Sequence, residues 1–258
     1  LALPVHGSLS TMHGRFACDS QRSFGSNCNQ LSPPSPAGVT LYVPDHFREH
    51  RSERIEELVR DNPFGILVTA SADVPEASHL AFTYRPGTPT EPAPVLLGHL
   101  ASSNPQCAAV RGGARAVVVF SGPNHYVSPR FYRTHPSTPT WNYCAVHMAG
   151  RLEPRPESED ADHVLGELTS AFERGFSEPF RYENLPADYT AGRKPGILSF
   201  AIHVETVDAQ FKMSQNRTID DRRGVIEGLR EIGGDNALAV AEIMDELLHR
   251  DYQEEVSR

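Results

Sequence analysis

Short runs of apolar and β-branched residues, separated by Gly, Pro and Asn, recur along the chain. This pattern predicts strands over residues 64–70, 78–84, 95–100, 114–120, 141–152 and 197–211. Gly150 indicates a bulge within the fifth strand. Because most strands follow one another across short turns, we expect antiparallel pairing. The predicted architecture is a closed or nearly closed β-barrel, and a β-sandwich is the alternative.

Helical periodicity is confined to segments around these strands. Apolar residues share one face over 45–61, where Asp45 is the expected N-cap. Further helices are predicted over 104–112, 158–174, 222–232 and 235–250. Since helices do not alternate one by one with strands, a parallel α/β sheet is disfavoured. The predicted fold class is α+β, mostly β with peripheral helices.

Composition divides the chain into three parts. Residues 1–40 are rich in Ser, Pro, Gly and Asn and lack sustained periodicity, so we predict a disordered N-terminal extension. They also lack the basic segment and apolar run of a secretory signal. Residues 41–232 hold every predicted strand and are expected to form one domain. Residues 233–258 are predicted to be a C-terminal helix and tail.

Charge and cysteine content limit the partners and the compartment. The chain has 258 residues and a formal net charge of −9, whereas nucleic-acid binders usually present a basic face. No run approaches the roughly 18 apolar residues of a membrane helix, so no membrane partner is expected. The four Cys form no CxxC pair. We therefore predict a reducing, cytoplasmic location, with Cys107 and Cys144 as buried thiols.

Two donor-rich stretches stand out at predicted strand ends. Lys212-Met213-Ser214-Gln215-Asn216-Arg217 brings a cation, a hydroxyl, two amides and a guanidinium together just before a helix. Pro139-Thr140-Trp141-Asn142-Tyr143 holds the single Trp at the start of another strand. Such clusters suit a planar ligand with polar edges. The simpler alternative is a hydrogen-bonded loop between strand and helix.

A series of short motifs places these stretches in a family. In order, the motifs are Leu41-Tyr42-Val43-Pro44, Ser78-His79-Leu80, Gly98-His99, Asn104-Pro105, Gly122-Pro123, Tyr126-Val127-Ser128-Pro129, Pro139-Thr140-Trp141-Asn142-Tyr143, Val146-His147 and Lys212-Met213-Ser214-Gln215-Asn216-Arg217. Over roughly 41–232 the chain resembles the PaiB family, described as FMN-binding negative transcriptional regulators. The resemblance implies a split β-barrel of the flavin-binding kind, and a homodimer with cofactor sites at its interface. The cofactor-binding candidates that it implies are His99, Ser102, Asn104, Trp141, Asn142, Lys212, Ser214, Gln215 and Arg217.

One departure from the family pattern bears on the cofactor. Ser102 stands where the regulator-like pattern Ala-Arg-x-Asn-Pro has Arg, the natural partner of the FMN phosphate. A branch similar to this family binds haem, which needs no phosphate clamp. That branch closes an N–N bond in N5-hydroxyornithine to make piperazate for nonribosomal peptides. We therefore predict haem, with FMN as the alternative cofactor.

The leading functional hypothesis is accordingly a haem-dependent cyclase that resembles piperazate synthases and takes a small amino-acid substrate. The alternatives are a PaiB-like FMN-binding negative transcriptional regulator and a flavin oxidoreductase of unknown substrate. No residue is assigned a catalytic role.

Five His lie near the strand ends or motifs, namely His79, His99, His125, His147 and His203. A single His in a strand is more often structural than a metal ligand. Because His99 ends an apolar strand beside the altered Ser102 turn, it is the first choice as axial ligand. His79 is the second. Both also occur in the regulator-like pattern, so neither distinguishes haem from FMN.

Overall fold

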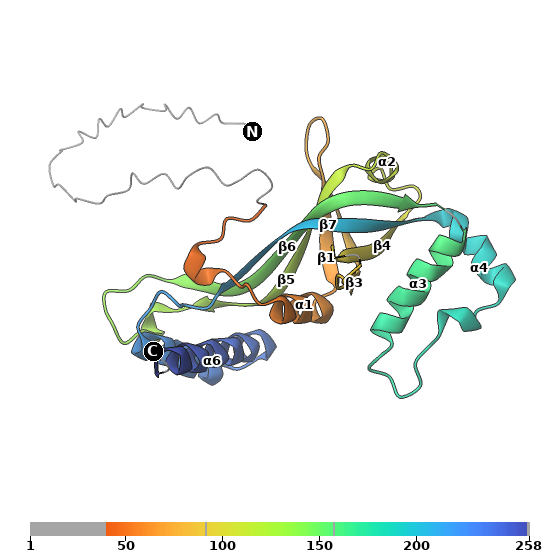
Figure 1. Cartoon of the computed structure of the whole chain (residues 1–258). Helices are drawn as coiled ribbons and strands as arrows, with labels where there is room; N and C mark the ends of the chain where they lie inside the picture. The colour runs from red at the N-terminus through yellow and green to blue at the C-terminus, as the bar shows by residue number, and fades with distance from the viewer. Residues whose placement is uncertain (1–39, 91, 157, 257–258) are drawn as a thin grey trace, which may run out of the picture. The chain divides into compact units, whose positions relative to one another are not determined.

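The computed structural model describes residues 40–90, 92–156 and 158–256 (Figure 1). These residues belong to one compact unit, which spans residues 36–258. Our prediction for residues 1–40 therefore lies, apart from Thr40, outside the described residues. No helix among the described residues is long and apolar enough to cross a membrane.

Within the described residues, seven strands form a single sheet in the order β2-β1-β5-β6-β7-β4-β3, and every neighbouring pair is antiparallel. Their bounds are β1 Phe64–Thr69, β2 Glu76–Ala81, β3 Thr83–Arg85, β4 Val95–Ala101, β5 Arg115–Val127, β6 Thr140–Arg155 and β7 Ile197–Lys212. The predicted antiparallel, strand-rich α+β fold is confirmed. The run at 78–84 is two strands, because the Phe82 amide donates to Pro63 O (2.9 Å).

Hydrogen bonds from the segment after β4 to β1 and β2 hold the sheet in a curled shape. The Asn104 amide, just after β4, donates to Ser78 Oγ of β2 at 2.9 Å. Gln106, which is almost completely buried, donates through Nε2 to Thr69 Oγ1 at 3.0 Å and to Glu76 O at 3.0 Å. These bonds join segments that are not neighbours in the strand order, and they satisfy polar groups that the curl buries.

The predicted bulge at Gly150 is present. The register of β6 against β7 shifts between Ala149 and Gly150. A Cβ at Gly150 would collide with the carbonyl oxygen of His203, so glycine is what lets the two backbones approach here. The bulge lies within the longest strand pair of the sheet, and Figure 1 shows β6 and β7 side by side.

Six α-helices are described: α1 Ser52–Asp61, α2 Cys107–Arg111, α3 Ser158–Phe172, α4 Ala187–Arg193, α5 Ile219–Ile232 and α6 Asp235–Val256. The prediction of Asp45 as an N-cap was wrong, since Asp45–Phe47 is a 3-10 turn and α1 begins at Ser52. The cause is tertiary: the Glu49 amide donates to Ala209 O (3.1 Å) and Arg48 bridges to Gln210, which keeps this segment extended. The short helix α4 was not predicted.

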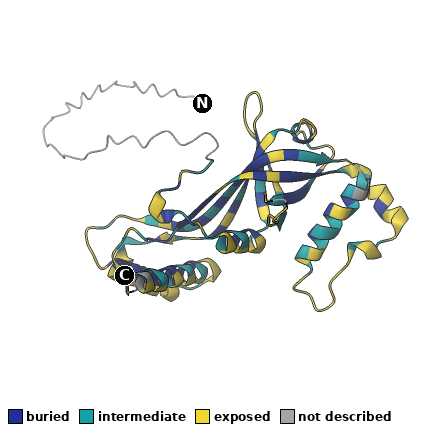
Figure 2. Ribbon diagram, in the orientation of Figure 1, coloured by how far each residue is buried: buried dark blue, intermediate teal, exposed yellow. Residues whose placement is uncertain are grey.

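The core lies inside the curled sheet and under the helices. Phe82 meets Phe120 and Phe200 edge to face, with ring centroids 5.8 and 6.4 Å apart. Buried residues of α5 and α6, including Leu229 and Met244, join the same cluster, which runs under both helices. A smaller cluster holds α3 against β4 and β7; its members are Leu97, Val164, Leu168 and Ala201. Figure 2 shows the buried positions concentrated on the strands.

The predicted thiols are also confirmed. Cys107 and Cys144 are buried and free. Burial raises the pKa of the Cys144 thiol far above its usual range, so this thiol is protonated and unreactive at neutral pH.

Candidate functional site

The candidate residues fall into two groups at opposite ends of β7. Ser102 lies beside the start of the strand, where its amide donates to Gly196 O at 2.9 Å. Lys212 is the last residue of the same strand. At about 3.3 Å per residue, the 16 residues of β7 separate the groups by roughly 50 Å. Figure 1 shows β7 running between α4 and α6. One chain therefore does not bring the predicted residues together.

The first group is the turn after β4. Asn104 is engaged by the fold, because Nδ2 donates to Ser78 Oγ (2.9 Å) and Oδ1 accepts from the Gln106 amide (2.9 Å). Ser102 is exposed. The chain next to this turn carries Arg193, whose exposed guanidinium lies 5.2 Å from the Tyr189 ring centroid. This guanidinium is a cation close in sequence to Gly196, which holds the turn.

His99 lies in a row of three cross-strand neighbours. It faces Ser199 of β7, which in turn faces Arg155 of β6. Each has a buried polar atom without a hydrogen-bond partner among the described residues: His99 Nδ1, Ser199 Oγ and Arg155 Nε. Burial lowers the pKa of His99, so its ring is neutral at pH 7. Nothing described fixes its orientation, whereas a ligating His is normally held by a partner on its second nitrogen.

His79 lies on β2, which is distant from β4 in the strand order, although the curl brings the adjacent Ser78 to Asn104 just after β4. His79 is exposed and stacks on Phe64 with ring centroids 6.1 Å apart. The strand register aligns His79 with Ile66, Val119 and His147 on one face across β2, β1, β5 and β6. This face therefore presents two imidazoles separated by aliphatic side chains.

His147 is the imidazole that the structure orients. Its Nδ1 lies 3.2 Å from Thr40 O, and Thr40 is held by Asp208 Oδ2, which accepts from its amide (2.9 Å) and hydroxyl (3.2 Å). Asp208 is buried, and Arg48 lies 3.7 Å from its other oxygen. A carbonyl oxygen only accepts, so Nδ1 carries the proton and Nε2 keeps its lone pair. Burial lowers the pKa of His147 and favours the neutral ring.

An apolar cavity of about 350 Å³ adjoins this imidazole. It shares Thr40 with the His147 network, and Ala149 is two residues along β6 from His147. Val68 and Val117 form part of its wall. A slot of this kind can accept a planar ring, and the neighbouring neutral imidazole can make one directed contact.

The second group surrounds the end of β7. Some of its polar side chains already form hydrogen bonds that hold the loop after β7. Asn142 is completely buried, donates to Met244 Sδ (3.2 Å) and accepts from Ser214 Oγ (3.1 Å). Ser214 has φ 62°, a left-handed conformation that this bond supports. Gln215 accepts from the Met213 amide (2.7 Å) and donates to Phe211 O (2.5 Å). These three polar side chains shape the loop.

Three other members of this group remain available to a ligand. Lys212 Nζ uses one donor on Thr140 Oγ1 (2.6 Å), and burial lowers its pKa. The Arg217 guanidinium lies 4.5 Å from the Tyr132 ring centroid. Trp141 is 54% exposed. Lys212 and Arg217 can each bind an anionic group, and the exposed Trp141 ring can pack on a flat one.

Sequence reasoning missed the His147 network and the apolar cavity. In a strand, residues two positions apart lie on the same face, so the sequence already placed His147 and Ala149 together. This pattern could have favoured His147 over His99 as the candidate ligand. Thr40 and Asp208 gave no local signal, since they are separated by 168 residues.

Comparisons with known proteins agree on the family and the fold. A protein-family model described as "Putative FMN-binding domain" matches residues 41–206. The chain is 32% identical over 210 residues to "Protease synthase and sporulation protein PAI 2" of Bacillus subtilis, covering 81% of this chain and 99% of that protein. It is 31% identical over 253 residues to an uncharacterised protein of Aspergillus fumigatus, covering 80% and 97%.

Solved structures show the same architecture. The "FAD and Heme binding protein from Mycobacterium smegmatis" is similar with a TM-score of 0.51 and 20% identity, over 64% of this chain and 73% of that one. A flavocytochrome of Azotobacter vinelandii has a TM-score of 0.50 and 14% identity, over 69% and 73%. At these identities the likeness shows the fold alone. The fold is the split β-barrel that the sequence resemblance implied.

Proposed function

Because this chain belongs to the PaiB family of FMN-binding-domain proteins, we propose that it binds FMN across the interface of a homodimer. The observation that carries the proposal is the separation of the two residue groups by the length of β7. A two-fold axis that aligns two copies antiparallel places the Ser102 turn of each copy beside the partner subunit's Lys212. Each site is then made from both chains, and neither chain can complete one alone.

The residues present fit FMN. Lys212 and Arg217 would supply cations for its phosphate, and Arg193, three residues before the Gly196 that accepts from the Ser102 amide, is a further cation on the neighbouring segment. Trp141, at the same end of the β6–β7 pair as Lys212, suits the ring system. Bound flavin would supply hydride or electron transfer, while the chain would position the ring and exclude water from it. The net charge of −9 favours small-molecule or protein partners over direct contact with nucleic acid.

A haem cyclase similar to piperazate synthases is the second candidate, and Ser102 favours it. In that case the structure supports a different axial ligand from the one that the sequence suggested. His147 has its Nδ1 fixed by Thr40 O and its Nε2 free of that bond, whereas His99 Nδ1 is buried without a hydrogen-bond partner among the described residues and His79 is exposed and stacks on Phe64. The apolar cavity also suits a porphyrin edge. The chain would then hold the propionates through Lys212 and Arg217.

Cofactor preference is tested directly on purified apoprotein. FMN is expected to bind saturably, with quenched flavin fluorescence and about one equivalent per chain, since the dimer holds two symmetric sites. Hemin should give only a broad, non-stoichiometric spectrum. A sharp Soret band at one equivalent per chain, together with unsaturable FMN binding, would replace the flavin proposal with the haem candidate.

His147→Gln is expected to change the spectrum of the bound cofactor, because it removes the Nε2 lone pair. His79→Gln, an exposed change on the same face, is the matched control and should leave the spectrum unchanged. Difference absorption spectra at saturating cofactor measure both. An unaltered spectrum in His147→Gln would show that this imidazole does not contact the ring.

The same substitution also predicts a pH effect on stability. Burial lowers the folded-state pKa of His147, so protonation favours the unfolded chain. The free-energy cost of protonating His147 in the folded chain is absent above about pH 6.5, the pKa of His in the unfolded chain. This cost grows as the pH falls below that value. Urea unfolding of the apoprotein should therefore lose less stability between pH 7 and pH 5 in His147→Gln than in the parent chain. An equal loss in both would contradict the prediction.

A further inference from the structure

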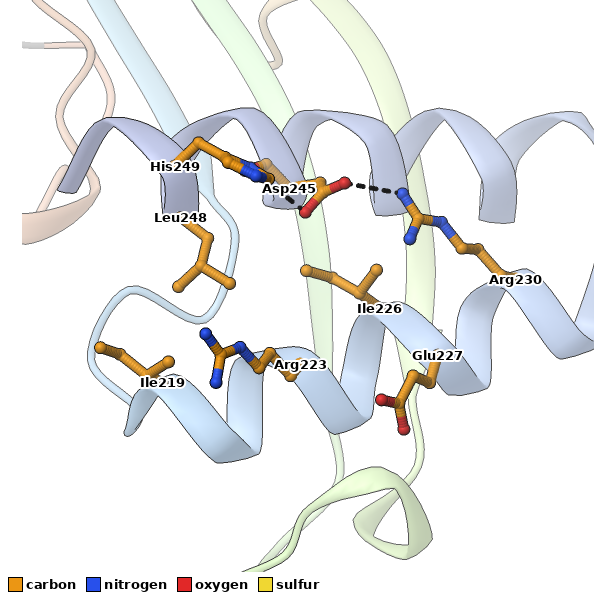
Figure 3. Close-up of a pocket in the computed structure, with 8 residues that line it drawn as sticks. All are labelled: Ile219, Arg223, Ile226, Glu227, Arg230, Asp245, Leu248 and His249. Carbon is orange, nitrogen blue, oxygen red and sulfur yellow. Dashed lines mark hydrogen bonds and ion pairs between the residues drawn. The ribbon is translucent and has the colours of Figure 1, made fainter. Parts of the chain in front are cut away.

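The C-terminal helix pair carries a second cavity, separate from the residues considered so far. α5 and α6 are joined through Gly233 and Gly234, whose positive φ values of 70° and 83° turn the chain sharply. A cavity of about 340 Å³ opens between the two helices (Figure 3). It lies beyond residues 41–206, to which the family model matches. The FMN-binding family match therefore does not account for it.

One wall of this cavity is apolar. Ile226 and Leu248 are 4% and 8% exposed, and they face the space between the helices. Ile219, at the start of α5, remains 39% exposed. Figure 3 shows these three side chains around the Arg223 guanidinium. An aliphatic wall with a half-open edge favours a ligand that has a compact apolar body.

Among the described residues, the charges that line the cavity leave the Arg223 cation poorly compensated. Arg230 donates to Asp245 Oδ2 at 2.8 Å, and Glu227 pairs with Arg133. The ion pair recorded for Arg223 is with Asp220 at 3.7 Å, longer than a hydrogen bond. Both of those side chains are more than half exposed, so the pair is weak. A carboxylate that entered the cavity could make the short, bidentate contact that Arg223 lacks.

His249 adds a directed polar group on the other helix. Its Nδ1 lies 2.8 Å from Asp245 O and 3.4 Å from Asp245 Oδ1, both of which only accept. Nδ1 therefore carries the proton in the neutral ring, and Nε2 is left as an acceptor. The cavity thus combines a cation, an apolar wall and a hydrogen-bond acceptor on its lining.

We propose that the α5–α6 cavity binds a small carboxylic acid with an apolar body of one or two rings and a hydrogen-bond donor. The carboxylate pairs with Arg223, the body packs on Ile226 and Leu248, and the donor meets His249. The volume supports this size, because a cavity of about 150 Å³ already holds benzene. The proposal is independent of the cofactor, since none of these residues belongs to either group along β7.

Indole-3-acetate is a suitable probe, and indole-3-acetamide is its uncharged match. Titration of the intact chain should move the methyl NMR signals of Ile226 and Leu248 saturably. The acetamide should bind about tenfold more weakly, because it lacks the charge-assisted contact. Equal affinity for acid and amide would overturn the proposal. So would the absence of a saturable shift at about 10 mM probe, where a ligand of this size should bind.

Variants separate this site from unspecific binding. Arg223→Gln should weaken the acid about tenfold and leave the amide unchanged, while Asp220→Asn should tighten the acid by removing a competing carboxylate. Arg174→Gln, an exposed change after α3, is the control and should have no effect. Amide signals from the sheet report that each variant is folded. Methyl shifts that follow protein concentration instead of the probe would assign the groove to a second copy and contradict the proposal.

Discussion

Replacing both Lys212 and Arg217 with Ala is expected to weaken FMN binding by about two orders of magnitude. Each cation contributes a charge-assisted hydrogen bond to the phosphate, worth about 1.5–3 kcal/mol, which is roughly tenfold or more in affinity. Lys212 is half-buried beside Thr140, so its contact is screened less than that of an exposed lysine. Flavin fluorescence titration measures the loss.

Control variants show whether this effect belongs to the site. Arg174→Ala removes an exposed cation elsewhere and should leave FMN affinity unchanged. Riboflavin, which lacks the phosphate, should bind the parent chain and the double variant almost equally. If riboflavin binding falls as far as FMN binding, the two cations support the loop rather than the phosphate, and their assignment is wrong. In that outcome, the packing of Arg217 on the Tyr132 ring would be the contact that supports the loop.

Local sequence patterns were sufficient for most of the fold. The strands were found because β-branched runs such as Phe64–Thr69 carry their own signal, and Gly150 marked the bulge correctly. The errors arose where a distant segment decides the conformation. Asp45 has the chemistry of an N-cap, but pairing with β7 holds Arg48 and Glu49 extended. Such long-range competition leaves no trace in a local pattern.

The motifs named candidate site residues, and the structure shows how the fold arranges them. The motifs located Lys212, Arg217 and Trp141, which remain available to a ligand. They could not show that Asn142 and Ser214 bond to each other. Nor could they show that His147 is oriented through Thr40 and Asp208, since those two residues are 168 positions apart in the sequence. Identity of residues is local information, whereas the use of each polar atom depends on the fold.

Two defective variants are expected to restore FMN binding when they share one dimer. The first reverses the charge at the β4 turn, with Ser102→Glu and Arg193→Glu, both exposed positions. The second is the Lys212→Ala, Arg217→Ala chain. Each homodimer carries a lesion in both of its sites. In the mixed dimer, one site collects both lesions, and the other is built entirely from unaltered residues.

The expected amount of binding follows from random assembly. Refolding the two chains together in equal amounts gives about half mixed dimers, each with one intact site, so about a quarter of the parent stoichiometry returns. The recovered sites should have parental affinity, because no altered residue lines them. Light scattering at micromolar concentration checks that each variant is still dimeric. Sites contained within one chain would give no recovery at any mixing ratio, since every chain carries one of the two lesions. Recovery near a quarter would therefore place the Ser102 turn and the Lys212 loop of different chains around the same cofactor.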